Sequence, residues 1–275
     1  MTDLDVASTA RPVTPAGILA AELTELCREL GDLPEVPAAL LDRAFRARSL
    51  ATGLDPYLDQ CTTAESPALA ALALRTQRTD WSDRSEGAVF LEQEMLSGHV
   101  EGQTLKFLVH LSRATRVLEI GMFTGYSALA MAEALPPGGT VLACEIDDEV
   151  ARFAQGCFDD SPAGDRITVA VGPALDTLQQ LPRDTAPFDF VFIDADKAGY
   201  LGYVEFLLQS PLLGPDAVIA VDNTLMQGQP YTGRAVTDNG EAITAFNTAI
   251  AEDPRVEQVL IPLRDGLTLI RRASA

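Results

Sequence analysis

Residues 116–127 read Arg-Val-Leu-Glu-Ile-Gly-Met-Phe-Thr-Gly-Tyr-Ser, an apolar run that leads directly into a turn with two glycines. An amphipathic helical pattern follows this turn, and short β-branched runs alternate with such patterns over most of the remaining chain. This alternation is typical of a parallel sheet whose strands are joined by crossover helices. We therefore expect an α/β domain with a Rossmann-like, mostly parallel sheet.

The apolar runs predict five parallel strands, near residues 116–120, 140–146, 167–171, 188–193 and 216–222. Helices are expected near residues 101–113, 125–135, 147–158, 173–181, 197–209 and 240–252. The end of the chain differs, because the runs 256–262 and 267–271 are joined by Arg264-Asp265-Gly266, and an Asp-Gly step is a hairpin signal. The parallel sheet is thus predicted to finish with a C-terminal antiparallel hairpin.

Residues 1–94 are predicted to form a helical N-terminal extension or cap. Helix starts marked by proline are found at Thr14-Pro15, Pro37 and Ser66-Pro67. The second of these helices is expected to stop at Gly53. The extension contains no pattern that indicates chemistry, so a packing or dimer-forming role is favoured over a catalytic one. The chemistry is expected in a second domain, residues 95–275.

The composition argues against several classes of partner. The chain has 275 residues and a formal net charge of −20, which opposes binding to nucleic acid or to an anionic membrane surface. Its four cysteines show no Cys-x-x-Cys spacing, so reduced thiols are expected rather than disulfides or a zinc site. We find no basic targeting segment and no apolar run of membrane-spanning length. A cytoplasmic protein that acts on a small molecule is predicted.

The turn after the first strand is the expected place for a cofactor, because open α/β sheets bind ligands beyond the carboxyl ends of their strands. A dinucleotide-binding turn would have three glycines, whereas residues 119–125 contain two. Glu119 would repel a pyrophosphate, but it suits the ammonium and sulfonium groups of S-adenosylmethionine. A nicotinamide-dependent reductase is therefore the disfavoured alternative.

Two further strand ends extend this pocket. The second strand ends at Glu145, where nucleotide-binding folds hold a ribose diol. The alternative for Glu145 is a charge at a helix N-terminus beside Asp147 and Asp148. The third strand ends at Gly172-Pro173-Ala174, which we expect near the adenine, although proline also simply favours the first turn of a helix.

The fourth and fifth predicted strands deliver polar side chains to the same edge. Asp194 and Lys197 follow the fourth strand, and Asp222 and Asn223 follow the fifth. Two carboxylates and an amide oxygen, with no His or Cys near in sequence, suit Mg²⁺, Ca²⁺ or Mn²⁺. We predict Asp194, Asp222 and Asn223 as the metal ligands. A cation with open sites can chelate two neighbouring oxygens of a vicinal diol and lower the pKa of the bound hydroxyl.

Lys197 is the candidate base for the acceptor hydroxyl, since a nearby metal charge favours its free amine. The alternative is a surface lysine that opens a helix. Methyl transfer is a direct displacement at a sulfonium methyl group, so positioning of the reactants supplies much of the rate. Two features stay open: His99 is either structural, which is favoured, or an auxiliary base, and the loop 224–239 is either an acceptor lid or a disordered linker.

Taken together, these motifs match a known family. The shared segments are residues 119–127, Gly172-Pro173-Ala174-Leu175, residues 188–197, Val221-Asp222-Asn223-Thr224 and Asp265-Gly266. From about Met95 to Arg272 the chain resembles the cation-dependent, catechol-type class I O-methyltransferases, which include caffeoyl-CoA and catechol O-methyltransferases. The resemblance implies a class I methyltransferase sheet, S-adenosylmethionine as cofactor, a divalent cation with Mg²⁺ as first candidate, and a homodimer.

The resemblance also assigns residues by position. The implied cofactor contacts are Met95, Ser97, Glu119, Gly121, Ser127, Glu145, Ala174 and Asp194. Asp194, Asp222 and Asn223 are implied as metal ligands, and Lys197 with Asp194 as catalytic residues. Two positions depart from the family pattern: Glu145 stands where many relatives have Asp, and Met226 stands where plant members commonly have Trp in the acceptor pocket.

The extension carries a second resemblance. Residues 10–15, residues 53–59 and Asp80-Trp81 look like the bacterial branch that methylates a cyclohexenone enediol, the 4-deoxygadusol step toward mycosporines. This implies demethyl-4-deoxygadusol as acceptor. The alternatives are aromatic catechols or caffeoyl-type substrates, and a non-catalytic binding protein that kept the fold. The acidity of the chain opposes a polyanionic CoA thioester, although Arg75, Arg78 and Arg84 form a local basic cluster.

Overall fold

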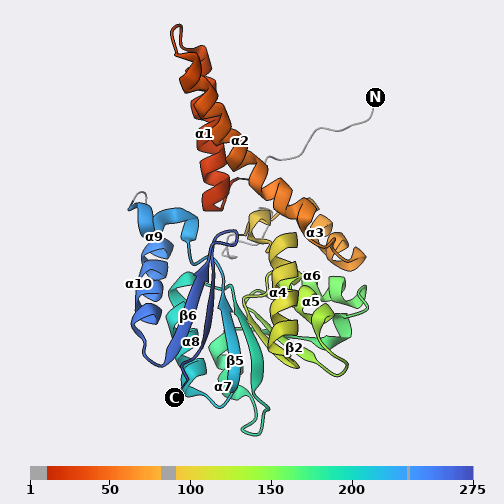
Figure 1. The fold of residues 1–275 in the computed structure, drawn as a ribbon. Coiled ribbons are helices and arrows are strands. Elements are labelled where there is room, and N and C mark those ends of the chain that lie inside the picture. Colours follow the sequence, from red (N-terminus) through yellow and green to blue (C-terminus); the bar gives the residue numbers. More distant parts are fainter. Residues whose placement is uncertain (1–10, 82–90, 234–235, 275) are drawn as a thin grey trace.

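The computed structural model describes residues 11–81, 91–233 and 236–274, and its centre is one seven-stranded sheet (Figure 1). The strands are β1 Arg116–Ile120, β2 Thr140–Glu145, β3 Ile167–Val171, β4 Phe188–Ile193, β5 Leu213–Val221, β6 Val256–Ile261 and β7 Leu267–Arg272. Their order across the sheet is β3-β2-β1-β4-β5-β7-β6. The first five pair in parallel, whereas β7 pairs antiparallel with both β5 and β6. The predicted fold class is confirmed.

One strand starts earlier than its sequence pattern indicates. β5 begins at Leu213 instead of residue 216, because Leu213 pairs with Phe188 at the start of β4. The register then shifts between Phe188 and Phe190, which leaves an irregular stretch for Gly214-Pro215. Proline cannot donate to a sheet ladder and is tolerated at such irregularities, so a Gly-Pro step that resembles a turn lies inside a strand.

Helices cover both faces of the sheet. One face packs against α3 (Pro67–Arg78), α4 (His99–Ser112), α5 (Tyr126–Ala134) and α6 (Asp148–Asp159). The other face packs against α7 (Ala174–Gln180), α8 (Tyr200–Gln209) and α10 (Asp238–Glu252). Shorter helical turns are η1 Gln93–Met95, η2 Gly164–Arg166, η3 Lys197–Gly199, η4 Met226–Gly228 and α9 Gln229–Thr232. Because successive strand residues point to opposite faces, Phe190 and Phe192 of β4 enter one core and Val191 and Ile193 enter the other.

The order of strands changes direction between β1 and β4, and their carboxyl ends lie side by side there. Gly121, directly after β1, has φ +89°, and a Cβ atom at this position would lie 2.2 Å from the carbonyl oxygen of Asp194. The Asp194 amide in turn donates to the Ile120 carbonyl at 2.9 Å. Only glycine permits this backbone approach, which holds the turn after β1 against the end of β4.

The extension begins with α1 (Pro15–Asp32) and α2 (Ala38–Cys61), a helical hairpin that projects from the sheet domain (Figure 1). The predicted starts are confirmed, and the Thr14 and Ser66 hydroxyls accept the amides of Gly17 and Leu69, both at 3.1 Å. The predicted stop of the second helix at Gly53 is wrong, because α2 continues to Cys61.

Tertiary contacts at the end of α2 explain this difference. Gly53 inside a helix costs only about 1 kcal/mol, although Pro56 costs about 3 kcal/mol more. Beyond both, the His99 ring of α4 lies with Nδ1 2.6 Å from Asp59 Oδ1 and Nε2 2.6 Å from the Thr63 carbonyl oxygen. Both ring nitrogens are engaged, so His99 has the structural role that the sequence favoured, and it ties α2 to the sheet domain.

Much apolar surface of the hairpin stays exposed. None of the 24 residues of α2 is buried, and Leu50 and Tyr57 are 80% and 64% exposed. The predicted homodimer, for which this surface is a candidate interface, stays a prediction. The four cysteines are free thiols, and among the described residues no helix is long and apolar enough to cross a bilayer.

Candidate active site

Lys197 lies at the centre of a polar cluster at the carboxyl edge of the sheet. Its Nζ donates to Asp194 Oδ1 at 2.9 Å, to Asn223 Oδ1 at 2.6 Å and to Tyr200 Oη at 2.6 Å. The ammonium group has three N–H donors, and all three are used. The lysine side chain is only 13% exposed, so the alternative of a surface lysine is wrong. Tyr200, which is fully buried, was not predicted as part of the site.

Asp222 completes the predicted ligand set from the end of β5. Its side chain is buried, and its amide donates to the Ile193 carbonyl at 3.0 Å, so the ends of β4 and β5 stay adjacent. Burial, followed by the charge of Asp194, raises the pKa of Asp222 to about 6, while Lys197 opposes the shift. Asn223 follows with φ +60°, a strained backbone of a kind that collects at functional sites.

Glu101 of α4 belongs to the same cluster and was missed by the sequence analysis. Its side chain is buried, Oε1 has no hydrogen-bond partner among the described residues, and Oε2 lies 3.4 Å from Arg264 Nη1. Burial, followed by the charge of Asp222, raises the pKa of Glu101 well above its usual range. A signal was present, because Glu101 lies at helical spacing before the buried Leu105 and Val109, on the face of α4 that should be apolar.

The charges of this cluster allow a test of whether a divalent cation fits. Three carboxyl groups, on Glu101, Asp194 and Asp222, are accompanied by two cations, Lys197 and Arg264, and burial together with crowding of the acids raises the pKa values of Glu101 and Asp222. The free buried oxygen of Glu101 shows that the cluster has more acceptors than its own donors satisfy. Within residues 11–81, 91–233 and 236–274, no three His, Cys, Asp or Glu side chains are arranged as a metal cluster. The predicted ligand set accordingly combines two carboxylates with the Asn223 amide. The donors here are hard oxygens, and a divalent cation would relieve the repulsion among the carboxyl groups, so Mg²⁺ or Ca²⁺ fits.

Glu119 of β1 belongs to the predicted cofactor pocket, and it lies just before the turn that follows this strand. The residue is completely buried, and neither carboxylate oxygen has a hydrogen-bond partner within the described part of the chain. Burial raises the pKa of Glu119 well above its usual range, the nearby Ser127 hydroxyl opposes this, and the Asp194 charge adds to it. A buried carboxyl group without partners is costly, so this position fits a ligand that brings hydrogen-bond donors or positive charge.

Glu145 is held by two backbone amides. Oε2 accepts from the Phe123 amide at 2.8 Å, and Oε1 accepts from the Asp147 amide at 2.9 Å. Asp147 caps α6, because its Oδ1 accepts from the amides of Glu149 and Val150. Glu145 also lies at this helix N-terminus, so both interpretations of Glu145 stay open. Each Glu145 oxygen keeps a lone pair for a further donor, as a ribose diol needs. Burial raises the pKa of this carboxyl group, and its backbone hydrogen bonds oppose the shift.

The remaining predicted cofactor residues are Met95, Ser97, Ser127 and Ala174, of which Ser127 is buried near Glu119. The Arg264 Nη1 and Nη2 atoms both donate to the Leu96 carbonyl at 3.2 Å, which fixes the segment that carries Met95 and Ser97. Ser97 is buried, Met95 is 42% exposed, and Ala174 is the buried first residue of α7. Their roles stay predictions.

The loop after Asn223 is ordered by the β6–β7 turn. The Asp265 carboxylate accepts from the Gln227 amide at 2.6 Å, and the carbonyl groups of Asp265 and Gly266 accept from Leu225 and Thr224 at 2.8 and 3.0 Å. Burial raises the pKa of Asp265 to about 7. Residues 226–232 are helical, so a disordered linker is wrong for this part, while 234–235 of the predicted loop lie outside the described residues.

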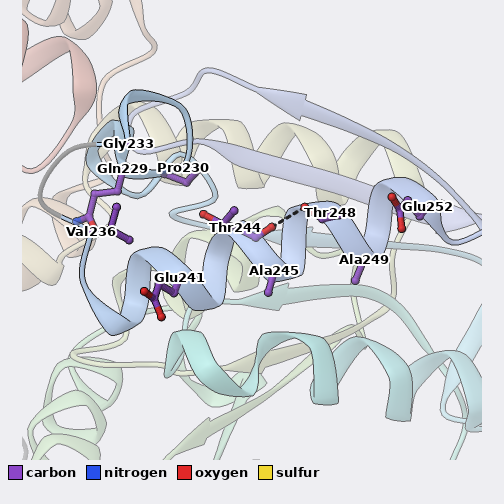
Figure 2. Close-up of a pocket in the computed structure, with 10 residues that line it drawn as sticks. All are labelled: Gln229, Pro230, Gly233, Val236, Glu241, Thr244, Ala245, Thr248, Ala249 and Glu252. Atoms are coloured by element: carbon purple, nitrogen blue, oxygen red, sulfur yellow. Dashed lines mark hydrogen bonds between the residues drawn. The ribbon is translucent and has the colours of Figure 1, made fainter.

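A surface hollow lies elsewhere, over α9 and the outer side of α10 (Figure 2). Its lining includes Gln229, Pro230, Glu241 and Glu252, and Thr248 donates to the Thr244 carbonyl at 2.9 Å along α10. The lining contains none of the predicted site residues, so we do not assign the hollow to the site.

The sheet order, the antiparallel last strand and the acidic turn after β1 define a methyltransferase-type α/β fold, and comparison with solved structures agrees. The methyltransferase PaMTH1 of Podospora anserina, solved with bound SAH, matches with a TM-score of 0.70 and 26% identity over 89% of this chain and 100% of that one. The O-methyltransferase TomG of Streptomyces achromogenes, solved with SAM, matches with a TM-score of 0.66 and 30% identity over 81% and 96%.

Sequence comparison gives the family. A family model described as O-methyltransferase matches residues 84–273. Caffeoyl-CoA O-methyltransferase 2 of Zea mays is 40% identical over 181 residues, which cover 62% of this chain and 68% of the maize protein. The chain belongs to the O-methyltransferase family, as its motifs predicted.

Proposed function

We propose that the protein transfers a methyl group from S-adenosylmethionine to one hydroxyl group of a small vicinal diol or enediol, with the help of a divalent cation. One observation carries this proposal: Asp194 joins the two halves of the site. Its backbone lies against Gly121 of the turn above Glu119, and its carboxylate accepts from Lys197. A donor bound over Glu119 would therefore lie beside the cluster that activates the acceptor.

S-adenosylmethionine would supply hydrogen-bond donors to the buried carboxyl oxygens that lack partners or have only one. Glu119 would receive the ammonium group of S-adenosylmethionine, and Glu145 would accept from the ribose hydroxyls. The SAH-bound fungal structure and the SAM-bound Streptomyces structure support this choice of ligand.

The acceptor half rests on Asp194, Asp222 and Asn223, which would hold the cation. When bound, the cation would polarise the acceptor hydroxyl and favour its ionised form. Lys197 would take the hydroxyl proton at Nζ as the neutral amine, so it must first release one proton to solvent and exchange one hydrogen bond, to Asp194 or to Asn223, for a lone pair. Tyr200 would then keep the amine in position, since its contact does not involve a predicted ligand.

For the acceptor, we propose a small cyclic enediol such as demethyl-4-deoxygadusol. The support is the resemblance of the extension to the mycosporine branch, together with a net charge of −20 that opposes polyanionic substrates. The identity to maize caffeoyl-CoA O-methyltransferase 2 favours caffeoyl-type aromatic diols as the second candidate.

The test is a methyl-transfer assay with S-adenosylmethionine and four acceptors: demethyl-4-deoxygadusol, catechol, caffeate and caffeoyl-CoA. Each is assayed with Mg²⁺ and again with EDTA. Metal-dependent turnover of the cyclohexenone alone would support the whole proposal, whereas turnover of the aromatic diols would keep the chemistry and reject the acceptor. Turnover that is indifferent to EDTA would reject the cation site.

A further inference from the structure

The third helix of the extension contacts the turn that follows β1. The Thr76 hydroxyl on α3 accepts from the Thr124 hydroxyl in the turn at 3.0 Å, and both side chains have no exposed surface. The same Thr76 hydroxyl also donates to the Leu72 carbonyl within α3 at 3.0 Å. A buried hydrogen bond between the extension and the cofactor turn therefore fixes α3 directly outside the predicted cofactor pocket.

Just after α3, Trp81 makes a second contact with this turn. Its ring lies 5.1 Å from the Phe123 ring, at 49°, and 5.4 Å from the Phe153 ring of α6, in an edge-to-face arrangement. The indole N–H donates to the Thr76 carbonyl at 2.9 Å, so the ring orientation is set by α3. We call Trp81, Phe123 and Phe153 the aromatic cluster; its ring separations are those of favourable aromatic pairs.

Phe123 connects this cluster to Glu145. Its backbone has φ +51°, a conformation that a phenylalanine adopts only when its surroundings hold it there. The amide of the same residue donates to Glu145 Oε2 at 2.8 Å. The ring of Phe123 is thus held by Trp81, and its N–H group orients the carboxylate proposed to bind the ribose.

We propose that Trp81 is a positioning residue of the S-adenosylmethionine site, and that α3 with Trp81 forms the outer support of the cofactor turn. The proposal rests on the proposed function for the identity of the ligand. Trp81 lies before residue 84, where the match to the O-methyltransferase family begins, so this support is a property of the extension. Loss of the Trp81 ring frees Phe123 to leave its strained conformation, and Glu145 then loses an orienting donor.

The chain offers a direct probe, because Trp81 is its only tryptophan. Fluorescence excited in the indole band reports this one position, without any substitution. Titration of the wild-type protein with S-adenosylhomocysteine is expected to change the emission along a saturation curve with the same Kd as calorimetry gives. Emission that stays constant while calorimetry shows binding would contradict the proposal.

Variants provide the second measurement. We expect Trp81→Ala to raise the Kd of S-adenosylhomocysteine at least fivefold and the KM of the methyl donor in parallel, with kcat at saturating donor within twofold. Trp81→Phe, which keeps an aromatic ring, should remain within twofold of the wild type. Tyr57→Ala is the matched control, because Tyr57 is an exposed aromatic residue of the same extension that lies on α2.

The possible outcomes distinguish failure of the role proposed for Trp81 from failure of the proposed function. A Trp81→Ala protein that loses thermal stability but keeps its Kd would show a structural residue only, and the inference would be wrong while the proposed function stood. If the wild-type protein does not bind S-adenosylhomocysteine by calorimetry, both fail. If Trp81→Ala does not fold, the Trp81→Phe protein and the wild-type fluorescence titration still decide.

Discussion

The helix α2 and the strand β4 show two different ways in which this chain holds its elements. α2 has 24 residues and buries none of them, whereas five of the six residues of β4 are buried. β4 is therefore fixed by packing on both of its faces, and α2 is joined to the sheet domain through polar contacts such as His99 with Asp59. The comparison teaches that the site residues stand on the rigid region, while the extension contacts the cofactor turn through α3 and Trp81.

The largest expected effect is on turnover, from a substitution at the carboxyl edge of the sheet. Asp222→Ala removes a predicted cation ligand, and we expect turnover to fall at least about 100-fold. Calorimetric binding of Mg²⁺ should be lost as well, while binding of S-adenosylhomocysteine is kept. Asp216→Ala is the control, since Asp216 is an exposed residue of the same strand. Unchanged activity of Asp222→Ala would favour the non-catalytic alternative.

Substitutions in β4 and in α2 should have very different effects on the free energy of unfolding. Phe192→Ala deletes a fully buried ring of β4, and we expect a loss of about 3–5 kcal/mol in the free energy of unfolding. Leu50→Ala on the exposed side of α2 should change it by less than about 0.5 kcal/mol in the monomer. Denaturant unfolding measures both, and equal losses would show that the extension is as tightly packed as the sheet.

Glu101→Gln sharpens the description of the cation site. The substitution keeps the shape of the side chain and removes a carboxyl group that a bound cation would ionise beside Asp222, so the Kd for Mg²⁺ should rise about tenfold. Binding of S-adenosylhomocysteine should not change. Glu133→Gln serves as control, because Glu133 is a largely buried glutamate that pairs with Lys106 at 2.7 Å. Equal Mg²⁺ affinity in the wild-type protein and Glu101→Gln would exclude Glu101 from the site.

A smaller effect concerns the contact between α2 and α4. Burial alone would lower the pKa of His99, but its contacts with the Thr63 carbonyl and Asp59 outweigh this and raise it. A raised folded-state pKa means that the stabilisation is complete below the unfolded value of about 6.5 and is lost as pH rises through the folded value. The difference in unfolding free energy between wild type and His99→Gln should thus be largest below the unfolded value and shrink as pH rises through the raised folded-state pKa of His99. A difference that grows with pH would contradict this sign.

The smallest expected effect on turnover concerns assembly. A homodimer that covers the exposed side of α2 should be disrupted by Leu50→Glu, with little change in kcat. Light scattering after size exclusion measures the mass directly. A wild-type monomer at micromolar concentration would remove the prediction.

Sequence patterns were most informative where the fold itself brings residues together. Asp194 and Asn223 follow neighbouring parallel strands, so their meeting at Lys197 could be predicted from strand ends alone. Glu101 and Tyr200 come from helices, where only the rotation and placement of the helix decide which side chain reaches the site. For that reason the first pair was found and the second was missed.

The error at Gly53 has the same origin. Local chemistry favoured a helix end there, but contacts of His99 with residues 59 and 63 hold the continuing helix. The contact between Trp81 and Phe123 likewise joins segments about forty residues apart and leaves no periodic signal in either. The sequence resemblance included Asp80-Trp81, but it did not predict the contact of Trp81 with the cofactor turn.

The close approach of Gly121 to the Asp194 carbonyl has a consequence for how this enzyme can be re-engineered. In the proposed function, the donor pocket and the acceptor pocket would share this backbone contact between Gly121 and Asp194. A chimera that joins the acceptor-binding segments of one relative to the donor-binding segments of another would fold correctly only if both relatives make this same backbone contact. Changes of substrate range are therefore easier to obtain from the segment 224–233 and the β6–β7 turn. These two segments contact each other and take no part in the contact between Gly121 and Asp194.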